Sequence, residues 1–496
     1  MNAQFLNNLV ALLPEVALLC LSLLVIVADL WSKHPQRSMT YWLTQFSLAG
    51  VALVQWALFD RTDAGYAMGG MVVVDPLGRL LGFFATVALM VSLVYARGYA
   101  VIHGLIKGEL FTLSMFMLLG IFIMLSSNHF LVSYLGLELM SLSLYALTAL
   151  RRDRAESTEA AMKYFVLGAL ASGFLLYGMS MVYGATGSLL IPVVFNTIST
   201  GLINNAVLVL GLVFVVAGLC FKLGVVPFHM WVPDVYEGAP TGITLLIAGA
   251  PKLAAFALTF RLLVEGMSGL AIDWQQMLMF VAVISLFVGN LAAIAQTNLK
   301  RMLAYSTIAQ IGFMLLGFTP TVVDLNTSSA ANGYGSALFY LVSYVLTTLG
   351  TFGIIMVMSR DGFECDKLQD FKGLARRNPW FAAIMGVFMF SLAGIPPTIG
   401  FYGKLAVLQA LVSTGHSFYI ALAVVAVVLS LIGAFYYLRV VKVMYFDDPV
   451  HEQPIVAGAD VQAVLSINGL AAIVLGIVPG GLMALCSEAL AKALSS

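Results

Sequence analysis

The fold class of this chain follows from two stretches of sequence: FKLGVVPFHMWVPDVYEG, residues 221–238, and SLAGIPPTIGFYGK, residues 391–404. Each lies in an apolar run longer than one membrane span, and prolines interrupt it at Pro227 in the first run and at Pro396 and Pro397 in the second. Proline removes a backbone N–H donor and clashes with the preceding turn, so it breaks a helix. Backbone groups freed inside a bilayer need protein or water as partners. Both stretches therefore predict broken helices that line an internal cavity.

The rest of the chain is equally apolar. Of its 496 residues, 61% are hydrophobic and 10% are charged, whereas soluble domains carry roughly 25% charged residues. No soluble fold of this length can bury so much apolar surface, so we expect an integral membrane protein in a lipid bilayer. The formal net charge of zero gives no indication of nucleic acid binding.

Apolar runs long enough to span a bilayer, roughly 20 residues each, predict about fourteen transmembrane helices. Their approximate ranges are 9–31, 40–59, 73–95, 110–126, 129–149, 162–184, 206–236, 241–264, 275–295, 302–319, 334–359, 380–413, 417–444 and 461–486. The first run lacks the basic flank of a signal peptide and is long enough to span, so it is expected to be a first transmembrane helix. The predicted fold class is all-α and polytopic, with helices 7 and 12 broken.

Positive charges alternate between the connections. Seventeen of the 24 Lys and Arg residues lie in or beside the odd-numbered connections, and three lie in or beside the even-numbered ones: Arg61, Arg79 and Arg261. Since cytoplasmic loops carry the excess of positive charge, the odd connections are expected in the cytoplasm. An even number of helices then places both termini on the periplasmic side.

The two broken helices lie five helices apart, which fits two five-helix repeats, helices 4–8 and 9–13. An odd repeat length inverts the second copy, and broken helices at matched positions indicate a transport site. We expect helices 1–3 in residues 1–108, the first repeat in 109–265, the second, inverted repeat in 266–446 and helix 14 in 447–496.

Glu138, Lys222, Lys252 and Lys404 are charged residues that lie deep inside apolar runs, away from the ends. Each costs about 2.5–3.5 kcal/mol at a helix centre. The structural alternatives are a glutamate paired for helix packing, and lysines held by ion pairs or by backbone carbonyls. Too few buried carboxylates exist to pair all three lysines, so a functional explanation is favoured.

Lysine suits proton transfer at such a place, because burial disfavours its charged form. A buried lysine is protonated or neutral according to one nearby charge, so an approaching carboxylate loads a proton and a receding one releases it. Several such groups joined by water form a relay across the bilayer. We therefore predict a proton relay of Glu138, Lys222, Lys252 and Lys404.

Four further residues are candidates with an ordinary structural alternative. Lys163, at the start of the sixth run, either snorkels to the cytoplasmic interface or belongs to the proton relay as the partner that holds Glu138 ionised. His229, beside the first break, either extends the proton path or caps unwound backbone. Tyr305 and Ser306 are candidate members of the path.

The sequence contains no motif for a redox centre or a nucleotide. Its four cysteines and six histidines are scattered without metal-type spacing, and neither GxGxxG nor a P-loop occurs. We therefore expect no cofactor and no metal in this chain. Moving one charge against 100 mV costs about 2.3 kcal/mol, so the work must come from a partner or from an ion gradient.

Several motifs resemble the antiporter-like subunits of respiratory complex I. The resemblance is carried by FKLGVVPFHMWVPDVYEGAPT, APKLAAFALTFR, LKRMLAYSTIAQIGFMLLG and SLAGIPPTIGFYGK, and it extends over about Asp75 to Lys442. PDVYEGAPT and GIPPTIGFYGK are most similar to the subunit N type of bacterial proton-translocating NADH:quinone oxidoreductase. Helix 11, ALFYLVSYVLTTLGTF, departs from related types because it has no charged residue, which leaves the middle of the relay to water, Tyr or Ser.

The resemblance implies a Glu138–Lys163 controlling pair, Lys222 and Lys252 in a first half-channel, and Lys404 in a second. It also implies that NADH, flavin, iron–sulfur clusters and most of the quinone site belong to other subunits of the membrane and peripheral arms. The expected function is proton translocation in the bacterial inner membrane, as a translocase subunit coupled at a distance to quinone reduction.

Two alternatives remain open at the level of sequence. A sodium/proton antiporter subunit is less well supported, because sodium prefers a cage of oxygen ligands and one central glutamate provides few. A non-pumping membrane scaffold, which only holds its neighbours together, predicts that Lys222→Ala and Lys404→Ala leave function intact.

Overall fold

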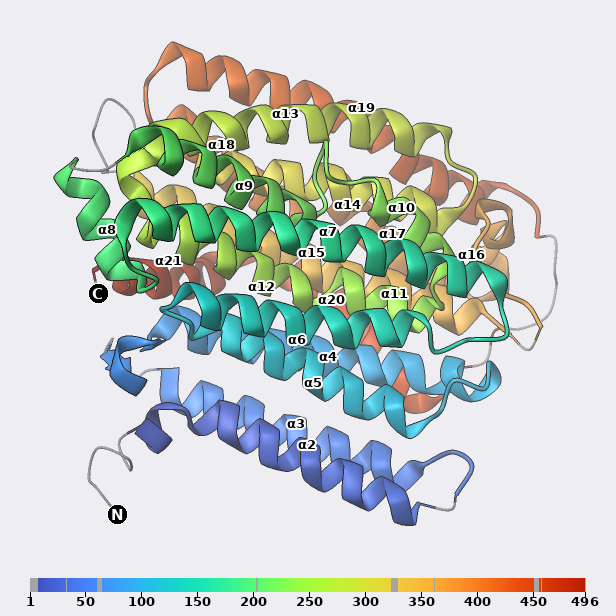
Figure 1. Cartoon of the computed structure of the whole chain (residues 1–496). Helices are drawn as coiled ribbons and strands as arrows, with labels where there is room; N and C mark the ends of the chain where they lie inside the picture. Colours follow the sequence, from blue (N-terminus) through green and yellow to red (C-terminus); the bar gives the residue numbers. More distant parts are fainter. Residues whose placement is uncertain are drawn as a thin grey trace.

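The computed structural model describes residues 8–32, 34–59, 65–201, 204–322, 329–360, 362–449, 455 and 457–495. Within these ranges the long helices run side by side as one bundle (Figure 1). One small antiparallel sheet is present there, in which β1 (Gly65–Ala67) pairs with β2 (Val72–Val74). The predicted all-α, polytopic fold class is confirmed.

Thirteen helical segments in the described part are long and apolar enough to cross a membrane. They are α2 (Leu13–Trp31), α3 (Ser38–Phe59), α4 (Pro76–Ile102), α5 (Gly108–Leu125), α6 (Phe130–Thr148), α7 (Ala155–Thr186), α9 (Asn205–Leu223), the joined α11, α12 and η2 (Thr241–Glu265), η3 with α13 (Ser268–Ala295), α14 with η4 (Leu299–Phe318), α15 (Ala330–Met358), α19 (Ser417–Phe446) and α20 (Ala459–Ile477). The shorter α17 (Pro379–Ala393) and α18 (Ile399–Val412) share one further crossing, which gives the fourteen predicted.

The remaining helices are short or peripheral. They are η1 (Met68–Gly70), α8 (Ile191–Thr200), α10 (Trp231–Gly238), η5 (Leu368–Phe371), α16 (Leu374–Arg377) and α21 (Gly480–Ser495). The prediction of one helix over 461–486 was wrong, because α20 ends at Ile477 and α21 begins after Pro479. Proline cannot continue the hydrogen-bond ladder of the preceding helix. The segment α21 then packs against α4 and α15.

The connections gather at the two ends of the bundle. The connections that follow α6, α13 and α15 meet at the right-hand end in Figure 1, which we call the basic end because Arg151, Arg154, Lys300 and Arg301 lie there. Helix α2 begins, and α21 lies, at the opposite end. Of the three basic residues assigned to the even-numbered connections, Arg61 lies outside the described residues.

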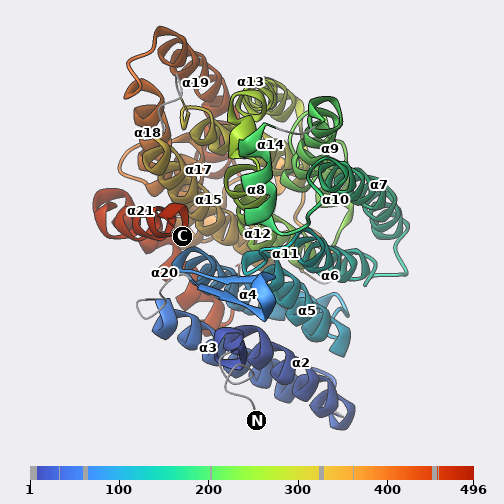
Figure 2. The same ribbon diagram turned by 60° about the vertical axis from the view of Figure 1, so that its left-hand side comes forward.

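The centre of the bundle is formed by α11, α12, α14 and α15, which are buried almost throughout, whereas α2, α19 and α20 are the least buried crossings (Figure 2). A helix with both faces covered by protein can carry polar groups that lipid would not tolerate. The central helices are therefore the ones on which a polar path can lie.

Glycines allow the closest helix contacts. A methyl group built at Gly120 of α5 would lie 2.5 Å from the Met140 amide nitrogen of α6, and one at Gly136 would lie 2.8 Å from the Met124 amide nitrogen. Helices in membranes associate through such small residues, because their backbones can then approach closely. The same kind of contact joins α13 to α14 at Gly289, where a methyl group would lie 2.8 Å from the Ala309 amide nitrogen.

We predict that Gly120→Val lowers the thermal unfolding midpoint, because the larger side chain forces α5 and α6 apart. Overpacking of this kind costs about 1–3 kcal/mol. The matched control is Gly173→Val in α7, where an added Cβ meets nothing within 4 Å. Both midpoints are measured on the purified protein in detergent, and equal midpoints for the two variants would contradict the packing argument.

Candidate functional site

Both predicted helix breaks are present, and their geometry is alike. Helix α9 ends at Leu223 and is followed by Gly224 with φ of 78°, while α17 ends at Ala393 and is followed by Gly394 with φ of 83°. A left-handed glycine directly after the last helical residue is a common way to end a helix. In both breaks the chain then turns before α10 or α18 begins.

The prolines lie inside these turns. The peptide bonds Val226–Pro227 and Pro396–Pro397 are both cis. In the first break, His229 lies two residues beyond Pro227 and is half-buried, and its backbone carbonyl accepts a 2.9 Å hydrogen bond from the Val232 amide. Its Nδ1 atom is buried without a hydrogen-bond partner among the described residues.

In the first half of the chain, two lysines meet neutral oxygens. Lys252 of α12 is only 1% exposed, and its Nζ donates a 2.8 Å hydrogen bond to the carbonyl oxygen of Leu223, the last residue of α9. Lys222, near the end of α9, donates a 2.9 Å hydrogen bond to Ser141 Oγ of α6. A cavity of about 20 Å³ lies between these two lysines, Ser141 and Tyr164, which is room for one water molecule.

The second break holds its lysine in a similar way. Nζ of Lys404, in α18, donates hydrogen bonds of 3.0 Å to the carbonyl oxygens of Leu392 and Ala393 at the end of α17. It donates a third, of 2.8 Å, to Ser430 Oγ of α19. A cavity of about 10 Å³ beside Lys404 is also lined by Gln310.

A chain of polar groups leads from Lys404 into the centre of the bundle. The Gln310 amide of α14 donates to the Leu392 carbonyl at 2.9 Å, so it shares this acceptor with Lys404. The same amide donates to Tyr437 OH at 2.8 Å, and Tyr437 OH lies 2.5 Å from Ser306 Oγ. With the shared Leu392 carbonyl, these side chains form one connected hydrogen-bonded path of five groups.

Helix α15 adds two tyrosines to this centre. Tyr340 OH donates to Gln310 Oε1, and Tyr344 OH lies 2.8 Å from Thr307 Oγ1. Both tyrosines are buried. Among the two neighbouring candidates from the sequence, Ser306 belongs to the path, whereas the half-buried Tyr305 makes no hydroxyl hydrogen bond to the described residues.

Glu138 and Lys163 are not paired in this structure. Lys163 Nζ lies 2.8 Å from Asp234 Oδ2 and 2.8 Å from Glu159 Oε1. Glu138 Oε1 is buried and accepts no hydrogen bond from a described residue. The direct pair implied by the family resemblance is thus replaced by a pair between Lys163 and Asp234 of α10.

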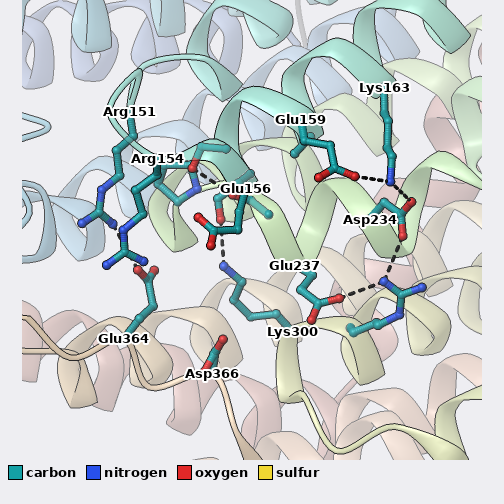
Figure 3. A pocket seen from close by; sticks show the side chains of 16 residues that line it. Arg151, Arg154, Glu156, Glu159, Lys163, Asp234, Glu237, Lys300, Glu364 and Asp366 are labelled. Atoms are coloured by element: carbon teal, nitrogen blue, oxygen red, sulfur yellow. Dashed lines mark hydrogen bonds and ion pairs between the residues drawn. The ribbon is translucent and has the colours of Figure 1, made fainter.

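Asp234 belongs to a charged cavity at the basic end of the bundle (Figure 3). The cavity has a volume of about 350 Å³ and is lined by side chains of both signs. Arg301 Nη1 of α14 bonds to Asp234 at 2.9 Å and to Glu237 at 2.8 Å, and Lys300 Nζ donates to the Ala239 carbonyl at 2.7 Å. Cations of α14 thus hold α10 and the residue that follows it to the second half of the chain.

Glu364, in the connection after α15, closes another side of this cavity. It accepts hydrogen bonds from Tyr99 OH, from Thr241 Oγ1 at 3.0 Å and from Arg151 Nη1 at 3.3 Å. Burial by itself would raise the pKa of Glu364, but the charge of Lys300 and the hydrogen bonds from Tyr99 and Thr241 outweigh it and lower this pKa.

The charged residues of this cavity were missed by the sequence analysis. Asp234, Arg301 and Glu364 lie next to helix ends, where charges are ordinary, so their residue types give no signal. One sequence feature does point to them: Asp234 and Glu237 are separated by three positions, which places them on one face of a helical turn.

The opposite end of the bundle contains a buried ion cluster. Arg261 Nη2 lies 2.7 Å from Asp75 Oδ2, Arg261 Nη1 lies 2.5 Å from Glu265 Oε1, and the arginine also donates to the Leu125 carbonyl at 3.1 Å. The side chains of Arg261 and Asp75 are 1% and 0% exposed. Arg261, which the sequence analysis assigned to the edge of a loop, therefore ties η2, the continuation of α12, to the start of α4 and the end of α5.

Comparison with known proteins places this arrangement in a family. Residues 127–430 match the family described as "NADH:quinone oxidoreductase/Mrp antiporter, TM". The chain is 57% identical over 493 residues to NADH-quinone oxidoreductase subunit N of Herminiimonas arsenicoxydans, with 99% of both chains covered. It is 57% identical over 490 residues to the protein of that name from Polaromonas naphthalenivorans, with 98% of both covered.

Solved structures show the same fold. A chain of respiratory complex I from Thermus thermophilus with bound aureothin has a TM-score of 0.80 and 30% sequence identity, and covers 96% of this chain and 99% of its own. A chain of the Mrp complex from Dietzia sp. has a TM-score of 0.83 with 99% of both chains covered. Its identity is only 20%, so this likeness concerns the fold alone.

We predict that Glu364→Gln lowers stability at pH 7 by about 1.5–3 kcal/mol, the usual worth of hydrogen bonds to a charged group. Because folding lowers the pKa of Glu364, its stabilising effect is complete above the ordinary value near 4.5 and is lost as the pH falls through the lower value of the folded protein. The thermal midpoints of wild type and variant should therefore converge as the pH falls below about 4.5.

The control for this pH series is Glu109→Gln, which changes an exposed glutamate at the start of α5. It should change the midpoint little at any pH. A difference between wild type and Glu364→Gln that stays constant from pH 7 down to about pH 3 would show that the charge of Glu364 is not what stabilises this end of the bundle.

Proposed function

The chain belongs to the family of transmembrane subunits shared by NADH:quinone oxidoreductases and Mrp antiporters, and on this basis we propose that it translocates protons as a membrane-arm subunit of a bacterial NADH:quinone oxidoreductase. Relatives that carry the name of subunit N match it over nearly their whole length. The complex I chain from Thermus thermophilus shares its fold at 30% identity.

The observation that carries this proposal is the set of partners of the three lysines. Lys222, Lys252 and Lys404 donate to hydroxyl and carbonyl oxygens, and none of them forms an ion pair with a described carboxylate. A carboxylate at 4 Å stabilises an ammonium by about 4 kcal/mol at an effective dielectric constant near 20. Without such a partner, a lysine can release its proton and take up another.

Polar groups of the second half of the chain extend from Lys404 toward the centre of the bundle. Hydroxyl groups both donate and accept hydrogen bonds, so Tyr437 and Ser306 can pass protons between water molecules. Lys404 and the Gln310 amide both donate to the Leu392 carbonyl, so proton transfer between these two groups needs a water molecule. Tyr340 and Tyr344 lie on helix 11, the helix in which related types carry ionisable residues. This supports the expectation that Tyr and Ser replace them here.

Glu138 and Lys163 are proposed as the controlling residues of the first half. Glu138 has an unpartnered oxygen one helical turn from Ser141, the acceptor of Lys222. Lys163 is bound instead to Asp234 at the basic end. We propose that a shift of Lys163 away from Asp234 toward Glu138 changes the charge near Lys222 and so moves its proton.

The remaining assignments follow from the family and from the charge pattern. The protein crosses the bacterial inner membrane many times, its basic end faces the cytoplasm, and both termini lie on the periplasmic side. Residues 109–265 and 266–446 form the two inverted repeats. NADH, flavin, iron–sulfur clusters and quinone are held by partner subunits of the membrane and peripheral arms, and their chemistry drives the relay.

We predict that Glu138→Ala, Lys222→Ala and Lys404→Ala each reduce NADH-driven proton pumping by roughly tenfold or more, since 1.4 kcal/mol at a limiting step is already tenfold. Pumping is measured with a pH-sensitive dye in sealed vesicles that contain the assembled complex. Lys492→Ala, in α21 and outside both repeats, is the control and should pump normally. Normal pumping in all three test variants would favour a scaffold over a pump.

A further inference from the structure

The ammonium groups of Lys252 and Lys404 occupy the same place relative to the two broken helices. Each donates to the carbonyl of the last residue of the first half-helix, Leu223 in α9 and Ala393 in α17. A methyl group built on the following glycine would lie 3.3 Å from the lysine Nζ in both breaks. An aromatic ring also faces each ammonium, with ring centroid to Nζ distances of 5.4 Å and 5.8 Å.

The two lysines reach this place from different helices. Lys252 comes from α12, which belongs to the membrane crossing that follows the first broken helix. Lys404 comes from α18, the second half of the second broken helix itself. Under the proposed five-helix repeats, the counterpart of α12 is α19. At this point α19 contributes Ser430, whose Oγ lies 2.8 Å from Lys404 Nζ.

The physical cause is the end of the first half-helix. The last carbonyls of a helix have no intrahelical donor, and the helix dipole gives this end a negative partial charge. In a bilayer these carbonyls need a donor, and an ammonium needs acceptors when it is withdrawn from water. The left-handed glycine leaves room for the ammonium, because an added Cβ there would crowd it at 3.3 Å.

We propose that the end of each first half-helix, together with its left-handed glycine, is a built ammonium site that selects a position rather than a particular residue. Gly224 and Gly394 are its positioning residues. A lysine from the second half of the broken helix, or from the helix of the next crossing, can fill the site. This inference rests on the proposed function and specifies where the proton-carrying ammonium groups of the relay must lie.

The first test moves the lysine of the second site to the other helix. Lys404→Ala is compared with the double variant Lys404→Ala/Ser430→Lys, in which the ammonium enters from α19 as Lys252 enters from α12. We expect pumping by the double variant to be at least roughly threefold above that of Lys404→Ala. Lys404→Ala/Ser430→Met, which adds a chain of similar length without the charge, is the matched control and should restore nothing.

The second test adds a methyl group at the glycine of the second ammonium site and leaves every lysine unchanged. An added Cβ at Gly394 would lie 2.8 Å from Lys404 Cδ, so Gly394→Ala should displace the ammonium and reduce protons pumped per NADH oxidised at least roughly threefold. Gly187→Ala and Gly201→Ala are the controls. These glycines also follow helices with φ of 73° and 68°, but an added Cβ there meets nothing within 4 Å. The amount of assembled complex is measured for every variant.

The outcomes separate this inference from the function itself. Normal pumping by Lys404→Ala would overturn the proposed role of this lysine. Loss of pumping in Lys404→Ala without rescue by Ser430→Lys in an assembled complex would overturn the position-selecting site and leave the function standing. If the double variant does not assemble, equal pumping by Gly394→Ala and Gly187→Ala overturns the inference, and a deficit confined to Gly394→Ala supports it.

Discussion

The structure depends on one constraint: inside a bilayer, every backbone N–H and C=O group must find a partner within the protein or in trapped water. Unbroken helices satisfy this constraint by themselves along most of their length. The two broken helices leave the carbonyls of Leu223 and Ala393 without a backbone N–H donor among the described residues of the same helix. Lysine ammonium groups bind these carbonyls. The need of the backbone for donors and the need of buried lysines for acceptors are therefore satisfied by the same contacts.

Cationic side chains have different partners at the ends and in the middle of the bundle. At the ends, cations are held by carboxylates, as in the buried pair Arg261–Asp75 and in the pair Arg301–Asp234 at the basic end. Between these ends, Lys222 and Lys252 meet only neutral oxygens. Breaking a buried pair by removing one partner costs several kcal/mol, so the ends keep their charge. The lysines in the middle of the bundle have no carboxylate partner within the described part of the chain. They can therefore lose and regain a proton without breaking a buried ion pair.

Much of the architecture follows from local sequence. Apolar runs of sufficient length predicted the fourteen crossings, because bilayer thickness sets helix length. Pro227 and Pro397 marked the breaks, because proline cannot donate a backbone hydrogen bond. The separation of α20 from α21 was not anticipated, since a hydropathy pattern does not show where one apolar run turns and packs along a neighbouring helix.

Local sequence was enough to predict the membrane-spanning helices, their interruptions and the lysines that lie among apolar neighbours. The partners of the lysines depend on the packing of the helices. Lys163 and Asp234, for example, are far apart in the chain and come into contact because α7 packs against α10. The same holds for Lys404 and Gln310, which share one carbonyl of α17. Spacing along a helix specifies a face, but the partner on that face is chosen by which other helix packs there.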